Sequence, residues 1–535
     1  MTIHNTTFVA RHRLGWMAFT LLAIALGLGA CAQEPWQTEA SPEQQAADAA
    51  NLKSDAVGPQ EHTDGQPAPS ASLDKIAPVP APGFNEKTEL SAPVAYRDKD
   101  MPAYNGAELP AQTESMTLDQ VYMMALQNDP QLHGVYKELR AMGYGVMAAR
   151  AGMLPSVSGQ FNRNQISQDV ISSDNTVYQH GSASWPETGW ALSLTQPIFD
   201  LGVYQKWRQS QDAERKQTAS YAAAQQDLML RTAIAYLSIL AAQDQIELTE
   251  AERRATEQQM ELVRARFQSG QKSQVDVSEV QARLDLQQAN TLLAHNDYLD
   301  KQQALLEIIG FGNVKLRRVR KDLPLDLPEP NDPQIWLRTA LEQNWSLRAA
   351  AAAVSIAERE AKVQKAGYWP NLGLQVTTGR NETGGSLFGG GSTIADTRVL
   401  LNLNVPLFQS GYTYGMSHAA VERLRAAQSD LSLARRKVQR QVFSSYQNII
   451  IGIDRIKALD SSVRSFELTL EQKQAGFKAG LNDNVSVLDT MRNLYNAKRQ
   501  QAEAVYNFLL DGLKLKQAAG TLNAADIAAI SQKIM

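Results

Sequence analysis

The stretch Ala151-Gly152-Met153-Leu154-Pro155 recurs in the second half of the chain as Ala366-Gly367-Tyr368-Trp369-Pro370. Three further pairs of stretches recur in the same order: 125–132 with 340–347, 196–199 with 405–408, and 267–270 with 477–480. The spacing between partners shifts only between the Pro155/Pro370 pair and the next one, where a surface loop can absorb a difference in length. Order and spacing together predict a tandem duplication.

Each half of the chain reads as a helix, two strands, a long helix and a further helix. The predicted long helices cover 200–269 and 409–479, and the shorter ones cover 117–152, 275–309, 333–367 and 485–520. At 1.5 Å per residue a helix over 200–269, which contains no proline, would extend roughly 100 Å, farther than a globular core reaches. The shorter helices are each about half as long, so two of them stacked end to end would lie alongside a long one.

Short segments in which apolar and polar residues alternate separate these helices. They cover 157–161, 190–196, 372–377 and 399–405, and Pro155, Pro197, Pro370 and Pro406 mark the expected junctions between helix and strand. Apolar residues on one side of a strand and small polar ones on the other are typical of an outer-membrane barrel. A pair of amphipathic hairpins on a soluble core is the alternative. The segments 167–188 and 381–396 are expected to be external loops.

Entry into a membrane would have to use these strands. After the first apolar run, no window of the sequence holds the 18 or more apolar residues of a membrane-spanning helix. Four strands do not close a barrel, since small closed barrels need about eight. Two copies would supply eight strands and three copies twelve, and an interior wide enough for passage favours three copies. The predicted fold class is mainly α, a tube of packed helices with a trimeric, twelve-stranded transmembrane β-barrel.

The N-terminus reads as a secretory signal peptide over residues 1–30. Arg11 and Arg13 precede an apolar run over 14–28, and a Leu-Gly-Ala-Cys sequence ends at Cys31, the only cysteine of the chain. This sequence resembles the bacterial lipobox. The resemblance implies that Cys31 becomes the first residue of the mature protein and carries acyl chains. A short membrane anchor with an incidental cysteine is the alternative.

Residues 31–112 are predicted to form a lipidated, flexible tether. They are rich in Ala, Pro, Ser, Gln and acidic residues, and they offer little apolar material to bury. By the same lipobox resemblance, Ala32 stands where an Asp would signal retention at the inner membrane, so the outer membrane is expected. The two repeats are predicted over 113–328 and 329–522, and a C-terminal tail over 523–535.

Composition and motifs argue against an enzyme and against nucleic-acid binding. The net charge of -4 over 535 residues provides no basic footprint for nucleic acid. The sequence contains no HExxH, GxSxG or P-loop motif and no Cys/His cluster, and its seven histidines are scattered. No catalytic residue, cofactor or metal site is therefore predicted.

Four stretches near the C-terminus resemble the TolC family of outer-membrane channels. They are Ala-Gly-Phe-Lys-Ala-Gly at 475–480, Val-Ser-Val-Leu-Asp at 485–489, Leu-Tyr-Asn-Ala-Lys at 494–498 and Ala-Gly-Thr-Leu at 519–522. The resemblance extends over nearly all of 116–522. It implies a homotrimer in the outer membrane of a Gram-negative bacterium, with a twelve-stranded barrel and a long periplasmic helical tunnel. It also implies a periplasmic adaptor and an inner-membrane pump or ABC transporter as partners, for efflux or type I secretion.

The same resemblance implies a periplasmic aperture that is closed until a partner docks. The positions that match the gate are Asp276, Phe477, Asn482, Ser486 and Asp489, and the positions that match the docking tips are Gly270 and Gly480. At the position of Asn482, close family members carry a basic residue, and this residue pairs with the counterpart of Asp276. At the position of Ser486 they carry a second Asp. We therefore expect a weaker latch, because Asn lacks the charge-assisted strength of an Arg fork. We also expect weaker cation selection, because only one carboxylate ring remains.

Two rival functions differ in what they predict. A lipid-anchored periplasmic coiled-coil structural protein without a pore would give no ion conductance in planar bilayers. A periplasmic adaptor also carries a helical hairpin, but it needs β-rich or lipoyl-like segments beside that hairpin. The duplicated order of helices and strands argues against an adaptor. Drugs, metals and unfolded polypeptides all stay open as the cargo.

Overall fold

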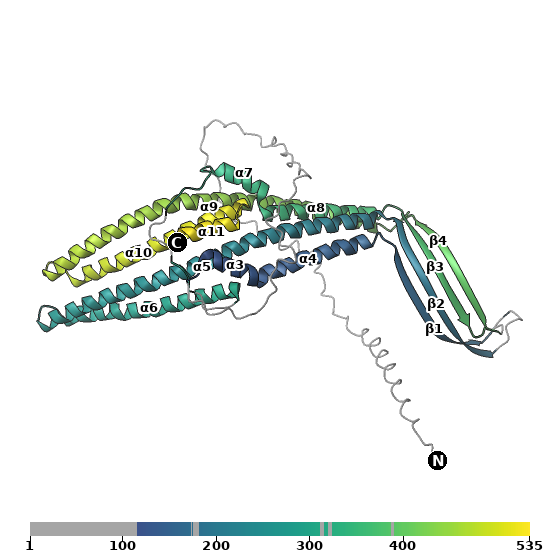
Figure 1. The fold of residues 1–535 in the computed structure, drawn as a ribbon, viewed down its shortest axis with the longest axis horizontal. Coiled ribbons are helices and arrows are strands. Elements are labelled where there is room, and N and C mark those ends of the chain that lie inside the picture. The colour runs from purple at the N-terminus through teal and green to yellow at the C-terminus, as the bar shows by residue number, and fades with distance from the viewer. Residues whose placement is uncertain are drawn as a thin grey trace, which may run out of the picture. The chain divides into compact units, whose positions relative to one another are not determined.

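A computed structural model describes residues 115–172, 174, 181–310, 315–318, 324–386 and 390–534. The predicted signal peptide, Cys31 and the predicted tether over 31–112 lie outside the described residues. Helices and strands follow one another in the same order twice, as the duplication predicts (Figure 1).

The two halves contain corresponding elements. The first half holds α3 (Leu118–Asn128), α4 (Pro130–Ala151), β1 (Ser156–Val170), β2 (Gly181–Phe199), α5 (Leu201–Gln268) and α6 (Gln274–Ile309). The second half holds α7 (Pro333–Gln343), α8 (Trp345–Ala366), β3 (Asn371–Thr383), β4 (Ser392–Asn404), α9 (Tyr412–Lys478) and α10 (Asn484–Ala519), and α11 (Ala524–Ile534) follows.

The long helices α5 and α9 contain 68 and 67 residues and lead from the sheet to the opposite end of the described unit (Figure 1). Neither contains a proline, so the backbone hydrogen bonds continue over about 100 Å in each. On the sheet side α4 packs against α5, and α6 packs against the far half of α5; α8 and α10 do the same along α9. The expected stacking of short helices along long ones is confirmed.

The structure corrects the two helices predicted over 117–152 and 333–367, because each of them is divided in two. Asp129 ends α3 and starts α4, and its carboxylate accepts a hydrogen bond from a backbone N–H one turn later at 2.8 Å. Asn344 does the same between α7 and α8 at 2.9 Å. A side chain that caps a new helix N-terminus competes with continuation of the preceding helix. Both caps stand in a landmark that the duplication repeats.

The strands occupy 167–170, 181–188, 381–383 and 392–396, so the prediction of external loops over the whole of 167–188 and 381–396 is wrong in these parts. β1 pairs with β2 along its whole length, and β3 pairs with β4 in the same way. The outer parts of these strands carry mostly polar residues on both faces. The sequence of these outer parts therefore shows no alternation of apolar and polar residues. The backbone pairing continues there because it does not depend on side-chain polarity.

The four strands form one antiparallel sheet in the order β1-β2-β3-β4. Near the helices, two neighbouring rows of registered residues differ in polarity. One row across the strands consists of Val157, Leu194, Val376 and Val399, and the next row, on the other face, of Ser158, Ser193, Thr377 and Arg398. In the second row the hydroxyls of Ser193 and Thr377 are hydrogen-bonded at 3.1 Å. One face of the sheet near the helices is therefore apolar and the other polar.

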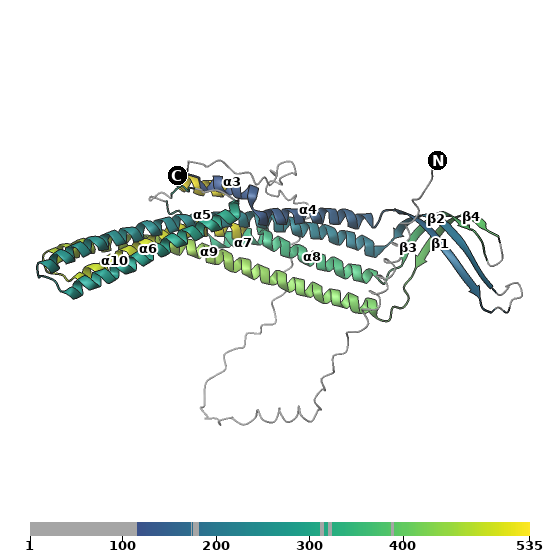
Figure 2. The same ribbon diagram turned by 90° about the horizontal axis from the view of Figure 1, so that it is seen from below.

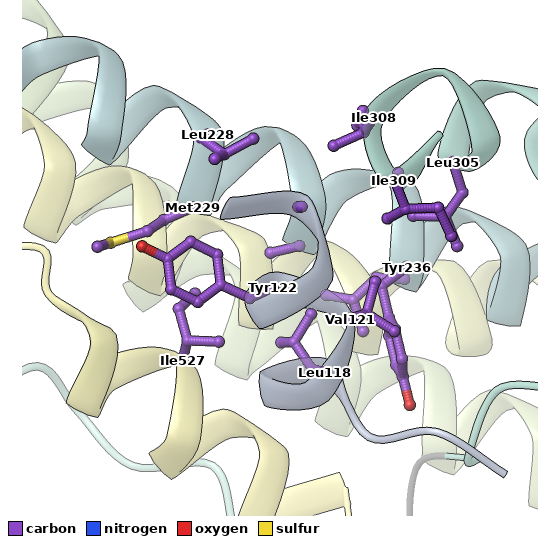
Figure 3. Packing of buried hydrophobic residues seen from close by; sticks show 14 of the residues in the cluster. Leu118, Val121, Tyr122, Leu228, Met229, Tyr236, Leu305, Ile308, Ile309 and Ile527 are labelled. Atoms are coloured by element: carbon purple, nitrogen blue, oxygen red, sulfur yellow. The ribbon is translucent and has the colours of Figure 1, made fainter. Parts of the chain in front are cut away.

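The largest buried cluster of the described residues lies midway along α5, where α3, the end of α6 and α11 meet (Figure 3). It includes Leu118, Val121 and Tyr122 of α3, Leu228, Met229 and Tyr236 of α5, Leu305, Ile308 and Ile309 of α6, and Ile527 of α11. The second half has its own cluster, in which Trp336 and Ala340 of α7 pack against α9 and α10. Burial of these apolar side chains holds the short helices on the long ones.

Tyr236 closes the first cluster against the segments before α3 and after α6. Its side chain is fully buried, and its hydroxyl lies 2.9 Å from the carbonyl oxygen of Arg317 and 3.1 Å from that of Met116. Burial raises the pKa of Tyr236 to about 12, so the hydroxyl keeps its proton and donates at neutral pH. Met116 also forms an isolated parallel bridge with Leu316.

The tail predicted over 523–535 contains a helix, α11, which packs on α3. Ile527 of α11 is fully buried in the first cluster. The hydroxyl of Ser531 donates a hydrogen bond to the carboxylate of Asp119 near the start of α3. The two ends of the described chain therefore share one core.

A buried ion pair joins the two halves between this core and the hairpin ends. Glu252 of α5 is only 2 % exposed. One of its carboxylate oxygens accepts a hydrogen bond from Arg499 of α10 at 2.9 Å, and the other accepts one from Gln287 of α6 at 2.7 Å. A buried carboxylate is tolerated only when it is paired and hydrogen-bonded. Glu252 therefore links the α5/α6 hairpin to α10.

Replacing Glu252 with Ala should lower the free energy of unfolding by about 3–5 kcal/mol, because the guanidinium of Arg499 would stay largely buried without its carboxylate. Glu250→Ala is the matched control, since Glu250 lies on the same helix and pairs with Arg254 at 3.4 Å near the surface. Its effect should stay below about 1 kcal/mol. Denaturant unfolding followed by circular dichroism measures both, and equal effects would contradict the linking role of Glu252.

Candidate functional site

The candidate site lies at the end of the described unit opposite the sheet, where α5 turns into α6 and α9 into α10 (Figure 2). Gly270 and Gly480 stand at these two tips with φ angles of 76° and 78°. At both tips the glycine N–H bonds to the carbonyl three residues back at 3.0 Å, and the next N–H bonds to the carbonyl five residues back at 2.8 Å. This is the Schellman pattern, which favours glycine because this residue adopts the left-handed backbone conformation.

The helices that follow the tips begin in the same way. Ser273 precedes α6 and Asp483 precedes α10, and their side chains accept hydrogen bonds from the backbone N–H groups of Asp276 at 3.3 Å and Ser486 at 3.0 Å. The carboxylate of Asp276 in turn accepts from the backbone N–H of Ser273 at 2.9 Å. This backbone bond is the main cause that holds the pKa of Asp276 below its ordinary value. Asp276 and Ser486 therefore occupy equivalent places in the two repeats.

Within one chain the described partners of Asn482 and Asp276 lie on their own hairpins. The amide of Asn482 donates to the carbonyl of Lys473 at 3.2 Å. The ammonium of Lys473 also donates to the hydroxyl of Ser486. Asp276 accepts from the ammonium of Lys272 at 3.3 Å. The structure thus gives these three expected gate residues local partners, and it does not bring Asn482 and Asp276 together within the chain.

Phe477 lies between the two hairpins instead of on their surface. Its side chain is 1 % exposed and packs in a cluster with residues of α5, α6 and α10. The guanidinium of Arg266, on α5, lies 4.4 Å from the centre of the ring. Arg266 also donates to the carbonyls of Phe477 and Lys478 at 2.6 and 2.8 Å. A cation at the last carbonyls of α9 complements the helix dipole, so Arg266 both caps α9 and holds the hairpins together.

Asp489 lies on α10, one turn after Ser486, and its side chain is 46 % exposed. The guanidinium of Arg283, on α6, approaches one carboxylate oxygen at 3.3 Å. The guanidinium of Arg492, on α10, approaches the same oxygen at 3.4 Å. The resemblance implied a ring of Asp489 alone, and the structure adds two cations to each carboxylate.

Reasoning from the sequence missed these arginines. Arg492 stands three residues after Asp489, a spacing that brings side chains together on a helix, so a local search could have found that pair. Arg266 and Arg283 pair with residues of the other hairpin. No local spacing signals a contact between residues of different repeats.

The four prolines expected at helix–strand junctions take different positions. Pro155 and Pro370 directly precede β1 and β3, and Pro406 follows the end of β4. Pro197 lies inside β2, two residues before its end, where the register between β2 and β3 shifts. A proline fits a strand at such an irregularity because the ladder does not need a hydrogen bond from its nitrogen there.

The tip residues form helix caps, ion pairs and a cation–π contact. These contacts fix the conformation of the two hairpin turns and place charged side chains at their surface. The described part of the chain contains no group of three or more His, Cys, Asp or Glu side chains that could hold a metal ion. Among the described helices none is both long enough and apolar enough to cross a membrane.

Comparison with known proteins identifies a family and a shared fold. Residues 121–311 and 336–521 match the family described as outer membrane efflux protein. The outer membrane protein TolC of Vibrio cholerae is 30% identical over 412 residues, which cover 77% of this chain and 92% of that protein. The alkaline protease secretion protein AprF of Pseudomonas aeruginosa is 27% identical over 412 residues, which cover 77% of this chain and 85% of that protein.

A solved structure is similar as well. The CmeC outer membrane channel of Campylobacter jejuni has a TM-score of 0.65 at 14% identity, and the match covers 80% of this chain and 95% of that one. The family match spans both repeats, and the relatives are matched over most of their length. The chain therefore belongs to the outer membrane efflux protein family, and it serves in the outer membrane as an exit duct for efflux or secretion.

Proposed function

We propose that three copies of this chain form one channel, in which the sheets close a barrel and the helices form a periplasmic tunnel. The sheet carries this proposal, because its apolar face has no cover within the described chain. Val157, Val399, Leu401 and Leu403 are 60 to 71 % exposed on that face. Contiguous exposed apolar residues mark a surface that meets a partner or lipid, and the alternation with a polar face is that of a barrel wall.

The edges of the sheet support the same proposal. Within the described chain, β1 pairs only with β2, and β4 pairs only with β3. In lipid the remaining backbone groups of both edge strands need partners. A second copy supplies them when its β4 lies beside β1 of the first, and a closed ring leaves no edge. Three copies give twelve strands, whereas two give eight, an interior that side chains fill.

A chain that carries Ser158→Cys in β1 together with Arg398→Cys, Leu400→Cys or Asn402→Cys in β4 should form covalent dimers and trimers. The reagent is a bis-maleimide that spans less than about 8 Å, whereas the two edges of one sheet lie roughly 14 Å apart. The three positions in β4 cover different registers between β4 of one copy and β1 of the next. Denaturing gel electrophoresis measures the products.

The single-cysteine variants are the controls for this experiment, because threefold symmetry keeps the copies of one site far apart. Ladders of equal strength from the single variants, or monomers alone from every pair, would reject the barrel.

In this proposal the hairpin tips form the periplasmic end of the tunnel, with Asp276, Phe477, Asn482, Ser486 and Asp489 around its aperture. All five residues lie in the tip region, at the opposite end of the long helices from the sheet (Figure 1). The contact between Phe477 and Arg266 joins the two hairpins. Opening the aperture therefore either breaks this contact or moves the two hairpins together.

The tips around Gly270 and Gly480 serve as the docking surface for a periplasmic adaptor, which connects the channel to an inner-membrane pump or ABC transporter. Leu481, next to Gly480, is 82 % exposed, and Phe267, near Gly270, is 41 % exposed. Exposed apolar side chains on rigid hairpin turns are suited to burial against a partner.

Leu481→Asp should prevent crosslinking to the adaptor and reduce export in cells, because a charged group would replace the apolar contact. Trimer formation should remain, since the tip lies far from the sheet. The control is Ile171→Asp, the same kind of change at a residue that is 87 % exposed at the sheet end of the unit. Crosslinking in cells followed by pull-down measures adaptor binding. A normal adaptor yield with Leu481→Asp would argue against docking at the tips.

The lipid anchor at Cys31 completes the proposal. A cysteine at the end of a signal peptide supports acylation at that residue. Acyl chains anchor a protein by burying methylene groups, at about 0.8 kcal/mol for each.

Cys31→Ser should abolish incorporation of labelled fatty acid and leave trimers in the membrane fraction, because strand pairing holds the barrel together. Label incorporation and native gel electrophoresis measure the two outcomes. Complete loss of trimers in this variant would mean that the lipid, and not the barrel, holds the copies together.

A further inference from the structure

We propose that Arg283 and Arg492 compensate the carboxylate of Asp489, so that the aperture does not select cations. This inference rests on the proposed aperture and names the residues that set its charge selectivity. The charge group consists of one carboxylate and two guanidinium groups, and it bridges α6 and α10.

The geometry of the group shows that both arginines act on the same carboxylate. The guanidinium groups of Arg283 and Arg492 lie 3.3 and 3.4 Å from one oxygen of Asp489. Arg283 reaches it from the other hairpin, and Arg492 reaches it from three residues along the same helix. Each copy of the chain therefore places two positive charges beside a single negative one.

The exposure of the three side chains lets these charges act on ions in solution. The side chains of Asp489 and Arg492 are 46 and 48 % exposed, and that of Arg283 is 23 % exposed. Ion pairs with this much exposure contribute less than about 1 kcal/mol to stability. The three side chains therefore contribute little to the stability of the fold. Their charges act mainly on the electrostatic potential at the tip.

The neighbouring charged groups are of both signs. Lys473 donates to the hydroxyl of Ser486, one turn before Asp489. Asp483, which caps α10, is the acidic residue between the tip glycine and Ser486. Asp276 has Lys272 as its own partner. Counted together, the cations Arg283, Arg492, Lys272 and Lys473 are four, and the carboxylates Asp489, Asp276 and Asp483 are three, so one positive charge is in excess.

Rings of uncompensated Asp or Glu favour the passage of cations. Here two guanidinium groups lie 3.3 and 3.4 Å from the carboxylate. An ion in the lumen is farther from the three groups than they are from one another, so it experiences their sum, which is one positive charge. The expected channel passes anions at least as readily as cations. Removing the two arginines should uncover the carboxylate ring.

The experiment uses full-length protein reconstituted in planar bilayers with a KCl gradient, where the reversal potential gives the ratio of potassium to chloride permeability. Combining Arg283→Gln with Arg492→Gln should raise this ratio roughly twofold or more. Arg492→Gln alone, an exposed change within one helix, should give part of the rise. Adding Asp489→Asn to the double variant should remove it.

The matched control combines Arg254→Gln with Arg425→Gln. These arginines are 55 and 68 % exposed and pair with Glu250 and Glu422 away from the tips. The control has the same total charge as the double variant, so an effect of overall charge would appear in both. A double variant with the permeability ratio of the control overturns the inference and leaves the channel intact. Unaltered trimers without conductance would instead overturn the proposed channel, and the inference with it.

Discussion

Two uninterrupted ladders of backbone hydrogen bonds, along α5 and α9, determine where the other described helices and strands lie. Each ladder continues over more than 65 residues because no proline interrupts it. The helices α4 and α6 divide the length of α5 between them, and α8 and α10 divide that of α9. The helices α3, α7 and α11 lie where the short helices meet, and their apolar residues join those of the longer helices in the buried clusters. The strands and the hairpin tips are thereby held at opposite ends of the same two helices.

Much of this arrangement follows from signals that the sequence carries locally. Freedom from proline, the repeated landmarks and the glycines that end α5 and α9 predict the long helices and their turns. The breaks at Asp129 and Asn344 escape such reasoning because a capping residue inside a helical pattern looks like a tolerated polar residue. The outer parts of the strands escape it because polar residues on both faces leave no alternation to detect. Only the register reveals that Val157 and Val399, at the two edges of the sheet, belong to one apolar row that crosses all four strands.

The site was less predictable than the fold, for a related physical reason. Gly270 and Gly480 have a backbone signature, whereas Arg266, which contacts Phe477, and Arg283, one of the two partners of Asp489, come from the other repeat. The duplication also conceals chemical divergence at equivalent places. Two residues after each tip glycine stands Lys272 in the first repeat and Asn482 in the second. The first hairpin therefore closes with an ionic contact to Asp276, and the second with a backbone contact from Asn482. One fold thus presents two different electrostatic surfaces at neighbouring tips.

The packing of α11 on α3 has a consequence for the order in which the chain can fold. The bond between Ser531 and Asp119 joins residues 412 positions apart, and Ile527 completes the apolar cluster around Leu118. A chain is synthesised from its N-terminus, so α3 is made long before α11 is available to cover it. Contacts between such distant residues form late because closing so long a loop costs conformational entropy. Loss of α11 would therefore leave the apolar face of α3, including Leu118, without its cover.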